Sequence, residues 1–213
     1  MHDDILDPAQ RAALSALKPA ADRGFYLAGG TGLCLHLAHR RSVDIDLFRT
    51  ESFDSEAIAR ELGASGVDLR DMRSAPATIH AQVLGVRTSL LSFPYPPLEA
   101  PIPTVAGVPV ASVRDIAAMK VEAIASRGAR KDFYDLYFIC HSGLSLDDAL
   151  DAFRARFASA SPDIYHRLRA LTFFDDAERE PELLLLRPAQ WGDVRSFFEV
   201  EARRVWAAAA PSR

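Results

Sequence analysis

The sequence predicts an α+β protein in two parts, an α/β part at residues 1–111 and a helical lobe at residues 112–213. Between residues 24 and 110, short runs that alternate apolar and polar residues are separated by glycine and proline, as in the strands of a sheet. From residue 112 onward, apolar residues recur at helical spacing behind Ser-x-x-Asp capping boxes. No linker rich in glycine and serine divides the parts, so we expect the helical lobe to pack on the α/β core.

Local signals place each element of the α/β part. Asp7 caps the first helix and Pro8 takes its first position, while the pair Gly29-Gly30 separates a buried strand from the next helix. Thr31 is expected to cap that helix, and period-two alternation marks the later strands. The expected elements are, in order, a helix from Asp7-Pro8 to Pro19, a strand at 24–28, a helix from Thr31 to Arg40-Arg41, a strand at 43–48, a helix from Ser52 or Asp54 to Gly63, strands at 67–70, 78–83 and 86–91, and an edge strand at 108–110.

The helical lobe is predicted from caps and breakers in the same way. Ser112 and Ser145 each stand three residues before an aspartate, which is the spacing of a capping box, and Gly128 ends the first helix. The expected helices run from Ser112 to Gly128, from Arg130 through Cys140, from Ser145 to Phe157, from Ser161-Pro162 to Leu171 and from Pro188 through Trp206.

The composition is that of an ordinary globular protein. Of the 213 residues, 49% are hydrophobic and 25% are charged, and the net charge is −4, which argues against a protein that coats nucleic acid by bulk electrostatics. No apolar run approaches the roughly 20 residues needed to cross a bilayer, so no membrane partner is expected. The N-terminus is acidic where a signal peptide would be basic, and we expect a cytoplasmic protein.

Two aspartates in the expected strand at 43–48 are the candidate metal ligands. With a period of two, Asp44 and Asp46 would point to one face of the strand, and Val43, Ile45 and Leu47 to the other. Two carboxylates that converge on one spot repel each other unless a cation lies between them. The pattern therefore indicates a hard divalent cation, with Mg²⁺ as the first candidate and Mn²⁺ as the second.

The glycine pair ahead of these aspartates is the candidate phosphate site. Gly29 and Gly30 let backbone N–H groups approach a phosphate at the start of a helix, where the helix dipole also favours an anion. Thr31 adds a hydroxyl. Either motif alone is more often structural, a tight turn or a solvated strand edge, but the two stand in one strand–turn–helix–strand context.

The spacing of these motifs carries a resemblance to a known family. Gly-Gly-Thr, twelve intervening residues and then Asp-x-Asp between apolar residues resembles the nucleotide-binding signature of the DNA polymerase β-like nucleotidyltransferase superfamily. The fuller string YLAGGTGLCLHLAHRRSVDIDLF is similar to the AbiEii/AbiGii toxin family. The resemblance implies a nucleotidyltransferase fold, with a mixed sheet, flanking helices and a C-terminal helical lobe.

A second block of residues is similar to the later half of the same family core. It consists of Ala118-Met119-Lys120, then Arg127-Gly128, then the run from Arg130 to Tyr137, so that the resemblance covers about residues 24–140. By this resemblance Lys120 is expected to contact the triphosphate, and Asp132 to be a functional carboxylate near the nucleotide. The residues alone leave a structural bridge from Lys120 to a carboxylate, and a surface ion pair of Asp132 with Arg130 or Lys131, as alternatives.

Basic residues near both blocks are candidate nucleotide contacts. Arg127 and Lys131 are expected to bind nucleotide, and with Arg40, Arg41 and Arg130 they could form a local basic surface around the acidic metal site. The alternative is that these side chains are solvated helix ends.

The function that the resemblance implies is metal-dependent transfer of a nucleoside monophosphate (NMP) from a nucleoside triphosphate (NTP) to RNA. The acceptor could be a tRNA 3′ end, and the protein would be a toxin opposed by an antitoxin partner. Catalysis is expected from Asp44, Asp46, Lys120 and Asp132, with Asp44 and Asp46 as metal ligands.

One departure from the superfamily pattern keeps other functions open. Two-metal enzymes of this superfamily usually take a third carboxylate from a later strand, but the run 85–91 contains no acid, and Ser89 or Thr88 stands in its place. A catalytically silent nucleotide-binding or protein-interaction module is therefore an alternative. Nucleotide transfer to a small molecule, such as an antibiotic hydroxyl, is another.

Overall fold

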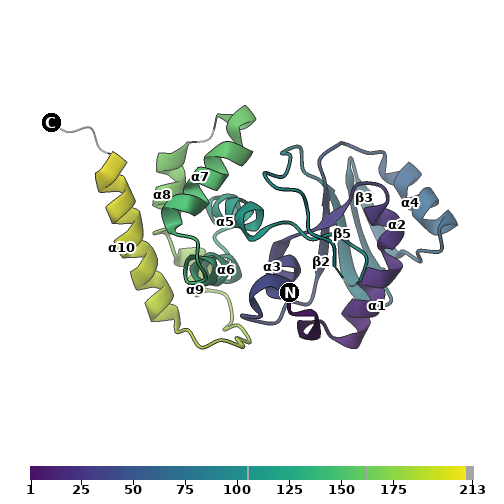
Figure 1. Cartoon of the computed structure of the whole chain (residues 1–213), viewed down its shortest axis with the longest axis horizontal. Coiled ribbons are helices and arrows are strands. Elements are labelled where there is room, and N and C mark those ends of the chain that lie inside the picture. Colours follow the sequence, from purple (N-terminus) through teal and green to yellow (C-terminus); the bar gives the residue numbers. More distant parts are fainter. Residues whose placement is uncertain (105, 162, 210–213) are drawn as a thin grey trace. The chain divides into compact units, whose positions relative to one another are not determined.

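The computed structural model describes residues 1–104, 106–161 and 163–209. The chain forms two units, Met1–Ser112 and Val113–Arg213, and each is described by itself (Figure 1). The first unit holds all five strands together with short helices, and the second is built from helices. The predicted α+β class is confirmed.

A mixed five-stranded sheet forms the centre of the first unit. Its strands, in the spatial order β1-β2-β5-β4-β3, are β1 (Tyr26–Leu27), β2 (Ile45–Arg49), β5 (Val86–Ser92), β4 (Thr78–Val83) and β3 (Arg70–Ala75). The pair β2–β5 is parallel, and the other three pairs are antiparallel. The chain therefore leaves the sheet after β2, forms the β3–β4–β5 meander and returns beside β2.

The helices of this unit are η1 (Asp3–Ile5), α1 (Pro8–Ala16), α2 (Lys18–Ala21), α3 (Gly29–Leu37) and α4 (Ser55–Ala64). The predicted cap of α1 is confirmed, because Asp7 accepts from the Gln10 backbone N–H at 2.8 Å and Gln10 closes a capping box. Thr31 was the wrong cap for α3. That helix begins two residues earlier with Ala28 as its N-cap, and it ends at Ala38 in a left-handed conformation, before the Arg40-Arg41 pair.

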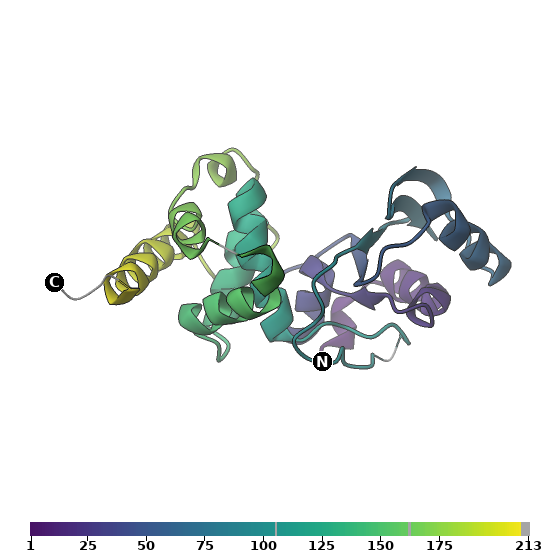
Figure 2. The same ribbon diagram turned by 90° about the horizontal axis from the view of Figure 1, so that it is seen from above.

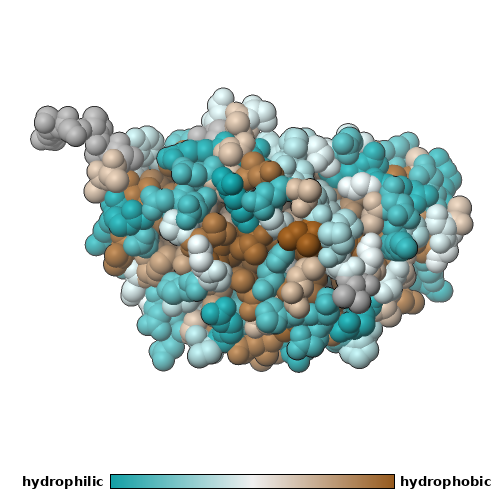
Figure 3. All heavy atoms as spheres, viewed as in Figure 1, coloured by the Kyte–Doolittle hydropathy of each residue, from teal (hydrophilic) through white to brown (hydrophobic). Residues whose placement is uncertain are grey.

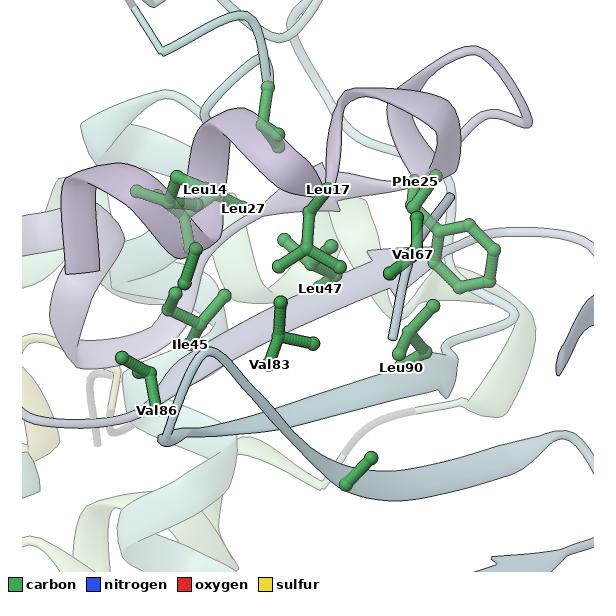
Figure 4. Packing of buried hydrophobic residues seen from close by; sticks show 14 of the residues in the cluster. Leu14, Leu17, Phe25, Leu27, Ile45, Leu47, Val67, Val83, Val86 and Leu90 are labelled. Atoms are coloured by element: carbon green, nitrogen blue, oxygen red, sulfur yellow. The ribbon is translucent and has the colours of Figure 1, made fainter. Parts of the chain in front are cut away.

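The core of the first unit lies between the sheet and α1. Leu14 and Leu17 are fully buried and pack with Ile45, Leu47 and Leu90 of the central strands (Figure 4). Ile45 and Leu47 alternate with half-buried Asp46, so one face of β2 belongs to the core and the other carries the acid. The apolar face thereby fixes which side of the sheet the aspartate occupies.

Three strand predictions need correction. The strand expected at 43–48 begins only at Ile45, and Val43, predicted to lie on the core face, is 62% exposed. The strand expected at 67–70 instead runs from Arg70 to Ala75, where a register shift and the positive φ of Asp71 reset its pairing. The edge strand expected at 108–110 is reduced to two isolated bridges of Val110, with Leu27 and Ile102.

The second unit consists of α5 (Val113–Arg127), α6 (Arg130–Cys140), α7 (Leu146–Arg156), η2 (Ala158–Ala160), α8 (Ile164–Ala170), α9 (Asp175–Glu178) and α10 (Trp191–Ala209), which Figure 2 shows from above. The predicted capping box at Ser145 is confirmed by Asp148. The last helix begins at Trp191 and not at Pro188. Asp163 caps α8, and Pro162, expected to open it, lies outside the described residues.

Aromatic rings fill the centre of the helical unit. Phe133 of α6 packs with its ring centroid 5.2 Å from Phe174, 5.9 Å from Trp191 and 5.5 Å from Phe198. These contacts join α6, the segment before α9 and α10. Hydrophilic residues lie over both units on the face shown in Figure 3. Among the described residues, no helix combines the length and the apolar character that a bilayer crossing requires.

Candidate active site

Asp44 lies immediately before strand β2, and Asp46 is the second residue of that strand. The carbonyl oxygen of Asp46 accepts from the Ala28 backbone N–H at 3.1 Å, which places the aspartate beside the turn into α3. Its carboxylate receives no hydrogen bond or ion pair from residues 1–104, 106–161 or 163–209. A carboxylate left this open is available to an external cation.

The glycine turn lies directly against this carboxylate. Gly29 has a φ of +63°, and a Cβ at that position would lie 3.2 Å from Asp46 Oδ2. A Cβ on Gly30 would lie 2.6 Å from Arg40 Nη2 and 2.9 Å from Ser42 Oγ. Glycine is therefore needed at both positions: Gly29 for its left-handed backbone and Gly30 for the close approach of the Arg40 guanidinium. The turn and the acids share one place in the first unit, as the sequence predicts.

Thr31 ties the start of α3 to the acid pair. Its hydroxyl donates a short hydrogen bond to the carbonyl oxygen of Asp44, and the residue is buried. The predicted contact of this hydroxyl with a phosphate stays a prediction. What the structure shows is a positioning contact, which holds the backbone of Asp44 against the first turn of the helix.

The two aspartates line an open groove of about 610 Å³ on the polar face of the sheet. Cross-strand pairing arranges this face in rows: Asp46 pairs with Ser89, Ser89 with His80, and His80 with Arg73. Residues in one such row project from the same face of a sheet. The groove therefore runs from two carboxylates on the β2 side to an imidazole and a guanidinium on β4 and β3.

The charge of Asp44 is balanced by an exposed partner. Arg87 Nε lies 2.8 Å from Asp44 Oδ1, and the arginine side chain is 71% exposed. This oxygen is nevertheless buried and has no aligned hydrogen-bond donor in the part of the chain that the structure describes. Exposed ion pairs contribute at most about 1 kcal/mol, so a ligand can displace the arginine at little cost.

The donor set suits a hard cation. The acids supply only oxygen ligands, and one of these is a buried carboxylate oxygen without an aligned hydrogen-bond donor among the described residues. The described residues contain no cluster of three or more His, Cys, Asp or Glu side chains placed for a metal. Mg²⁺ is commonly bound by one or two carboxylates, with substrate phosphates and water completing its shell. The donor set of Asp44 and Asp46 therefore fits Mg²⁺.

Ser89 and Thr88, the two residues expected in place of a third carboxylate, differ in their surroundings. Ser89 lies opposite Asp46 on the parallel neighbour β5, whereas Thr88 is buried and donates its hydroxyl to the Val86 carbonyl oxygen at 3.1 Å. Ser89 Oγ lies 3.2 Å from His80 Nδ1. The sequence prediction missed His80. Its position in an alternating run, Thr78–Val83, marks it as facing away from the core, but only the pairing of β4 with β5 brings it beside Ser89.

The predicted residues of the second block form a buried ion cluster in the helical unit. Lys120 Nζ of α5 lies 2.7 Å from Asp132 Oδ1 and 2.6 Å from Asp135 Oδ2, both on α6. Arg127 completes the cluster with a bidentate contact, 2.7 Å from Nε to Asp132 Oδ2 and 3.1 Å from Nη2 to Oδ1. Both carboxylates are fully buried, and the Lys120 side chain is 4% exposed.

The contacts in this cluster exclude one of the two interpretations that the sequence left open for Asp132. Asp132 is not in a surface ion pair with Arg130 or Lys131; it is a buried acid held by Lys120 and Arg127. The structural bridge, which was the alternative for Lys120, is present, while its contact with a triphosphate stays a prediction. Burial alone would raise the pKa of Asp132, but the two cations outweigh burial and lower the pKa below its usual value.

Two of the five basic residues that were expected at a common surface are buried. Arg40 and Arg130 are buried, Arg40 against Gly30 and Arg130 in a stack on the Trp191 ring, with its Nε donating to the Ala177 carbonyl oxygen at 2.9 Å. Neither is a surface contact or a solvated helix end. Arg41 is exposed, Lys131 is half-buried, and the Arg127 side chain is 56% exposed.

Comparisons with known proteins match nearly the whole chain. The family model described as "Nucleotidyl transferase AbiEii toxin, Type IV TA system" matches residues 12–210. A protein of Aquifex aeolicus (strain VF5), named uncharacterized protein aq_aa25, is 34% identical over 179 residues, which cover 82% of this chain and 84% of that protein.

Solved structures share the fold at low sequence identity. The nucleotidyltransferase toxin MenT4 (Rv2826c) of Mycobacterium tuberculosis H37Rv matches with a TM-score of 0.55 and 16% identity, covering 94% of this chain and 87% of that chain. The antibiotic-resistance factor ANT(2'')-Ia matches with a TM-score of 0.50 and 18% identity, covering 73% and 97%. The predicted polymerase β-like nucleotidyltransferase fold is confirmed.

Proposed function

Because the chain belongs to the nucleotidyl transferase AbiEii toxin family, we propose that it transfers an NMP from an NTP to an RNA acceptor, such as a tRNA 3′ end. The observation that carries this proposal is the contact between the glycine turn and the acid pair: Asp46 Oδ2 lies within 3.2 Å of where a Cβ on Gly29 would be. A phosphate at the turn and a cation on the acids would thus be neighbours, as nucleotidyl transfer requires.

In the first unit, the start of α3 is the proposed phosphate site, and the acid pair is the proposed metal site. The backbone N–H groups at the start of α3, at Gly29 and Gly30, bind triphosphate oxygens, and the helix dipole supports the negative charge. Asp44 and Asp46 hold Mg²⁺, which when bound neutralises charge on the phosphates of the NTP and on the leaving pyrophosphate. Arg87, displaced from Asp44, is then a free cation on the groove wall.

The second block contributes through its ion cluster. Lys120 and Asp132 are the proposed catalytic pair of the helical unit, with Arg127 and Lys131 as further contacts to the nucleotide. The exposure of Arg127 supports this role, since 56% of its side chain is open to a ligand while Nε holds Asp132. Buried Lys120 fixes the position of Asp132.

The family description names a type IV toxin–antitoxin system. We take the protein to be the toxin of such a pair, with an antitoxin protein expressed alongside it. Growth arrest on expression of the wild type, relieved by an Asp46→Asn substitution, would support the assignment. Normal growth at the same protein level would contradict it.

The enzymatic proposal is tested by label transfer. Purified protein is incubated with each α-labelled NTP, Mg²⁺ and either total RNA or tRNA, and labelled RNA is separated by gel. Transfer by the wild type and by Asp68→Asn, with none by Asp44→Asn or Asp46→Asn, is the expected result. Asp68 is the matched control, because it is an exposed acid that pairs with Arg70 and does not line the groove. Equal transfer by all four proteins would refute the proposed site.

One observation favours a second candidate. Ser89 stands opposite Asp46, where two-metal enzymes of this superfamily carry an acid, and this suits a protein that binds nucleotide without turning it over. Calorimetry that shows NTP binding, with no labelled product from RNA or from an aminoglycoside, would select this silent module. Labelled aminoglycoside without labelled RNA would instead select small-molecule transfer.

A further inference from the structure

We infer that His80 is the general base of the transfer reaction, taking the proton from the acceptor hydroxyl in place of the missing third carboxylate. The inference rests on the proposed function and deepens it, because it assigns the proton-transfer step to a residue outside both motif blocks. It starts from the row of side chains across β2, β5, β4 and β3, in which Ser89 separates Asp46 from His80.

His80 lies two strands away from Asp46 in the same cross-strand row. Neighbouring strands lie about 4.8 Å apart, so the backbone of His80 on β4 is about 10 Å from that of Asp46 on β2. An acceptor hydroxyl that attacks a phosphorus held at Asp46 would lie between these two backbones. The groove that contains both side chains has a volume of about 610 Å³, within the range of pockets that hold small ligands.

The imidazole of His80 is hydrogen-bonded to the Ser89 hydroxyl through one of its two nitrogens. His80 Nδ1 lies 3.2 Å from Ser89 Oγ, and among the described residues the side chain of His80 has no other hydrogen bond or ion pair. If Nδ1 carries the hydrogen and donates to the serine hydroxyl, Nε2 is unprotonated and can accept a proton. Ser89 then selects the tautomer, as the partner of the second nitrogen does for other functional histidines.

The electrostatic surroundings are mixed and open to solvent. The charged groups that face the groove with His80 are Arg87 on β5, Asp71 and Arg73 on β3, and the two acids at β2, Asp44 and Asp46. Gln82 of β4 donates to Asp71 at 3.0 Å, so this acid is engaged away from the imidazole. Arg73 is the neighbour of His80 in the same row, and it is exposed, as a contact for an acceptor phosphate would be.

The reaction step balances without a further reactant. The O–H bond of the acceptor breaks, and its proton moves to Nε2 of His80. The acceptor oxygen forms a bond to the α-phosphorus of the NTP, and the bond from that phosphorus to the bridging oxygen breaks. Pyrophosphate leaves with the electron pair, and the imidazolium later releases its proton to water.

The test measures kcat, the KM for NTP and their pH dependence for the wild type, His80→Gln and Ser89→Ala, with the acceptor found in the label-transfer assay. A general base contributes on the order of 10²–10⁴-fold, so kcat of His80→Gln should fall by that factor while NTP binding is unchanged. The acidic limb of the kcat profile should disappear, and added imidazole should restore part of the rate. The kcat of Ser89→Ala should fall by a smaller factor, and its pH profile should keep the acidic limb.

A matched control separates this role from general effects of losing a histidine. His166 is an exposed histidine of α8 in the other unit, and His166→Gln should behave like the wild type. If the wild type transfers nucleotide and His80→Gln keeps its rate and its pH profile, the inference is wrong while the proposed function stands. If the wild type transfers nothing to any acceptor, the proposed function fails, and the inference with it.

Discussion

Two pairs of aspartates in this molecule have opposite surroundings. Asp44 and Asp46 lie in an open groove, where exposed Arg87, paired with Asp44, is the only cation in an ion pair with either acid among the described residues. Asp132 and Asp135 are fully buried, and Lys120 reaches both of them while Arg127 clasps the first. The first pair is short of positive charge, whereas the second is neutralised by the protein itself.

The difference in burial explains why one pair is neutralised within the fold and the other is not. A buried charge must be paired within the fold, because removing it from water costs several kcal/mol. An acid pair at the surface of a groove can stay under-compensated, since water screens it until a ligand arrives. The open pair is thus suited to take up a cation, whereas the closed pair joins α5 to α6 and fixes the position of Asp132, the proposed catalytic carboxylate.

The largest expected effect is on activity, at the open pair. Asp46→Asn should lower nucleotide transfer on the order of 10²–10³-fold, because it removes one charge that positions the cation on the phosphates. Its free energy of unfolding should stay within about 0.5 kcal/mol of the wild type, since repulsion with Asp44 is relieved. Transfer assays and urea unfolding measure both quantities. A large loss of stability would show that the groove acids are structural after all.

The next effect is on stability, at the closed pair. Lys120→Met should lower the free energy of unfolding by about 3–5 kcal/mol, because it removes the cation that two buried carboxylates share. Arg154→Ala, which removes an exposed pair with Asp151, should cost less than about 1 kcal/mol. A Lys120 variant that is stable yet inactive would show that this lysine contributes to triphosphate binding and not to the stability of the fold.

Acid should weaken the closed pair through Asp132. Its pKa is lowered in the folded state, so the folded protein binds fewer protons than the unfolded chain, and stability falls as the pH falls through that pKa. The difference in unfolding free energy between the wild type and Asp132→Asn should therefore shrink from about pH 5 downward. Denaturant unfolding at several pH values measures it, with exposed Asp151→Asn as the control. A constant difference would mean that Asp132 is not ionised in the fold.

The smallest expected effect concerns the turn beside the open pair. Gly29→Ala should cost about 1 kcal/mol, because alanine is strained at a positive φ and its Cβ would press on Asp46 Oδ2. Transfer should fall with it, as the carboxylate is displaced. Gly63→Ala, in α4 with nothing within 4 Å of the new Cβ, should be neutral or slightly stabilising. Thermal unfolding of the two variants provides the comparison. Equal melting temperatures would show that alanine at position 29 is not strained.

The features that sequence predicted well are local in the chain. The caps at Asp7 and Ser145 depend on residues three positions away, and both are present. The glycine turn and the acid pair are fifteen positions apart, from Gly29 to Asp44, within one strand–helix–strand unit whose geometry leaves few alternatives. Their neighbourhood could therefore be predicted from spacing alone.

The features that sequence missed depend on distant pairing. The bond from His80 to Ser89 requires the register of β4 on β5, and the burial of Arg40 requires the close approach of Gly30. Val43 looked like a core residue by alternation, but the strand begins only at Ile45, after the segment that Thr31 holds through the Asp44 carbonyl. Tertiary contacts of this kind override local pattern, because they add burial and hydrogen bonds that no short window contains.

The parallel pairing of β2 with β5 also dictates when the groove can exist during synthesis. Ile45 aligns with Thr88 and Asp46 with Ser89, so the acids meet their opposite wall only after α4 and the β3–β4 hairpin have been made. Closing a loop of this length is slow compared with forming a helix. A nascent or truncated chain that stops before β5 carries both aspartates but lacks the opposite wall of the groove.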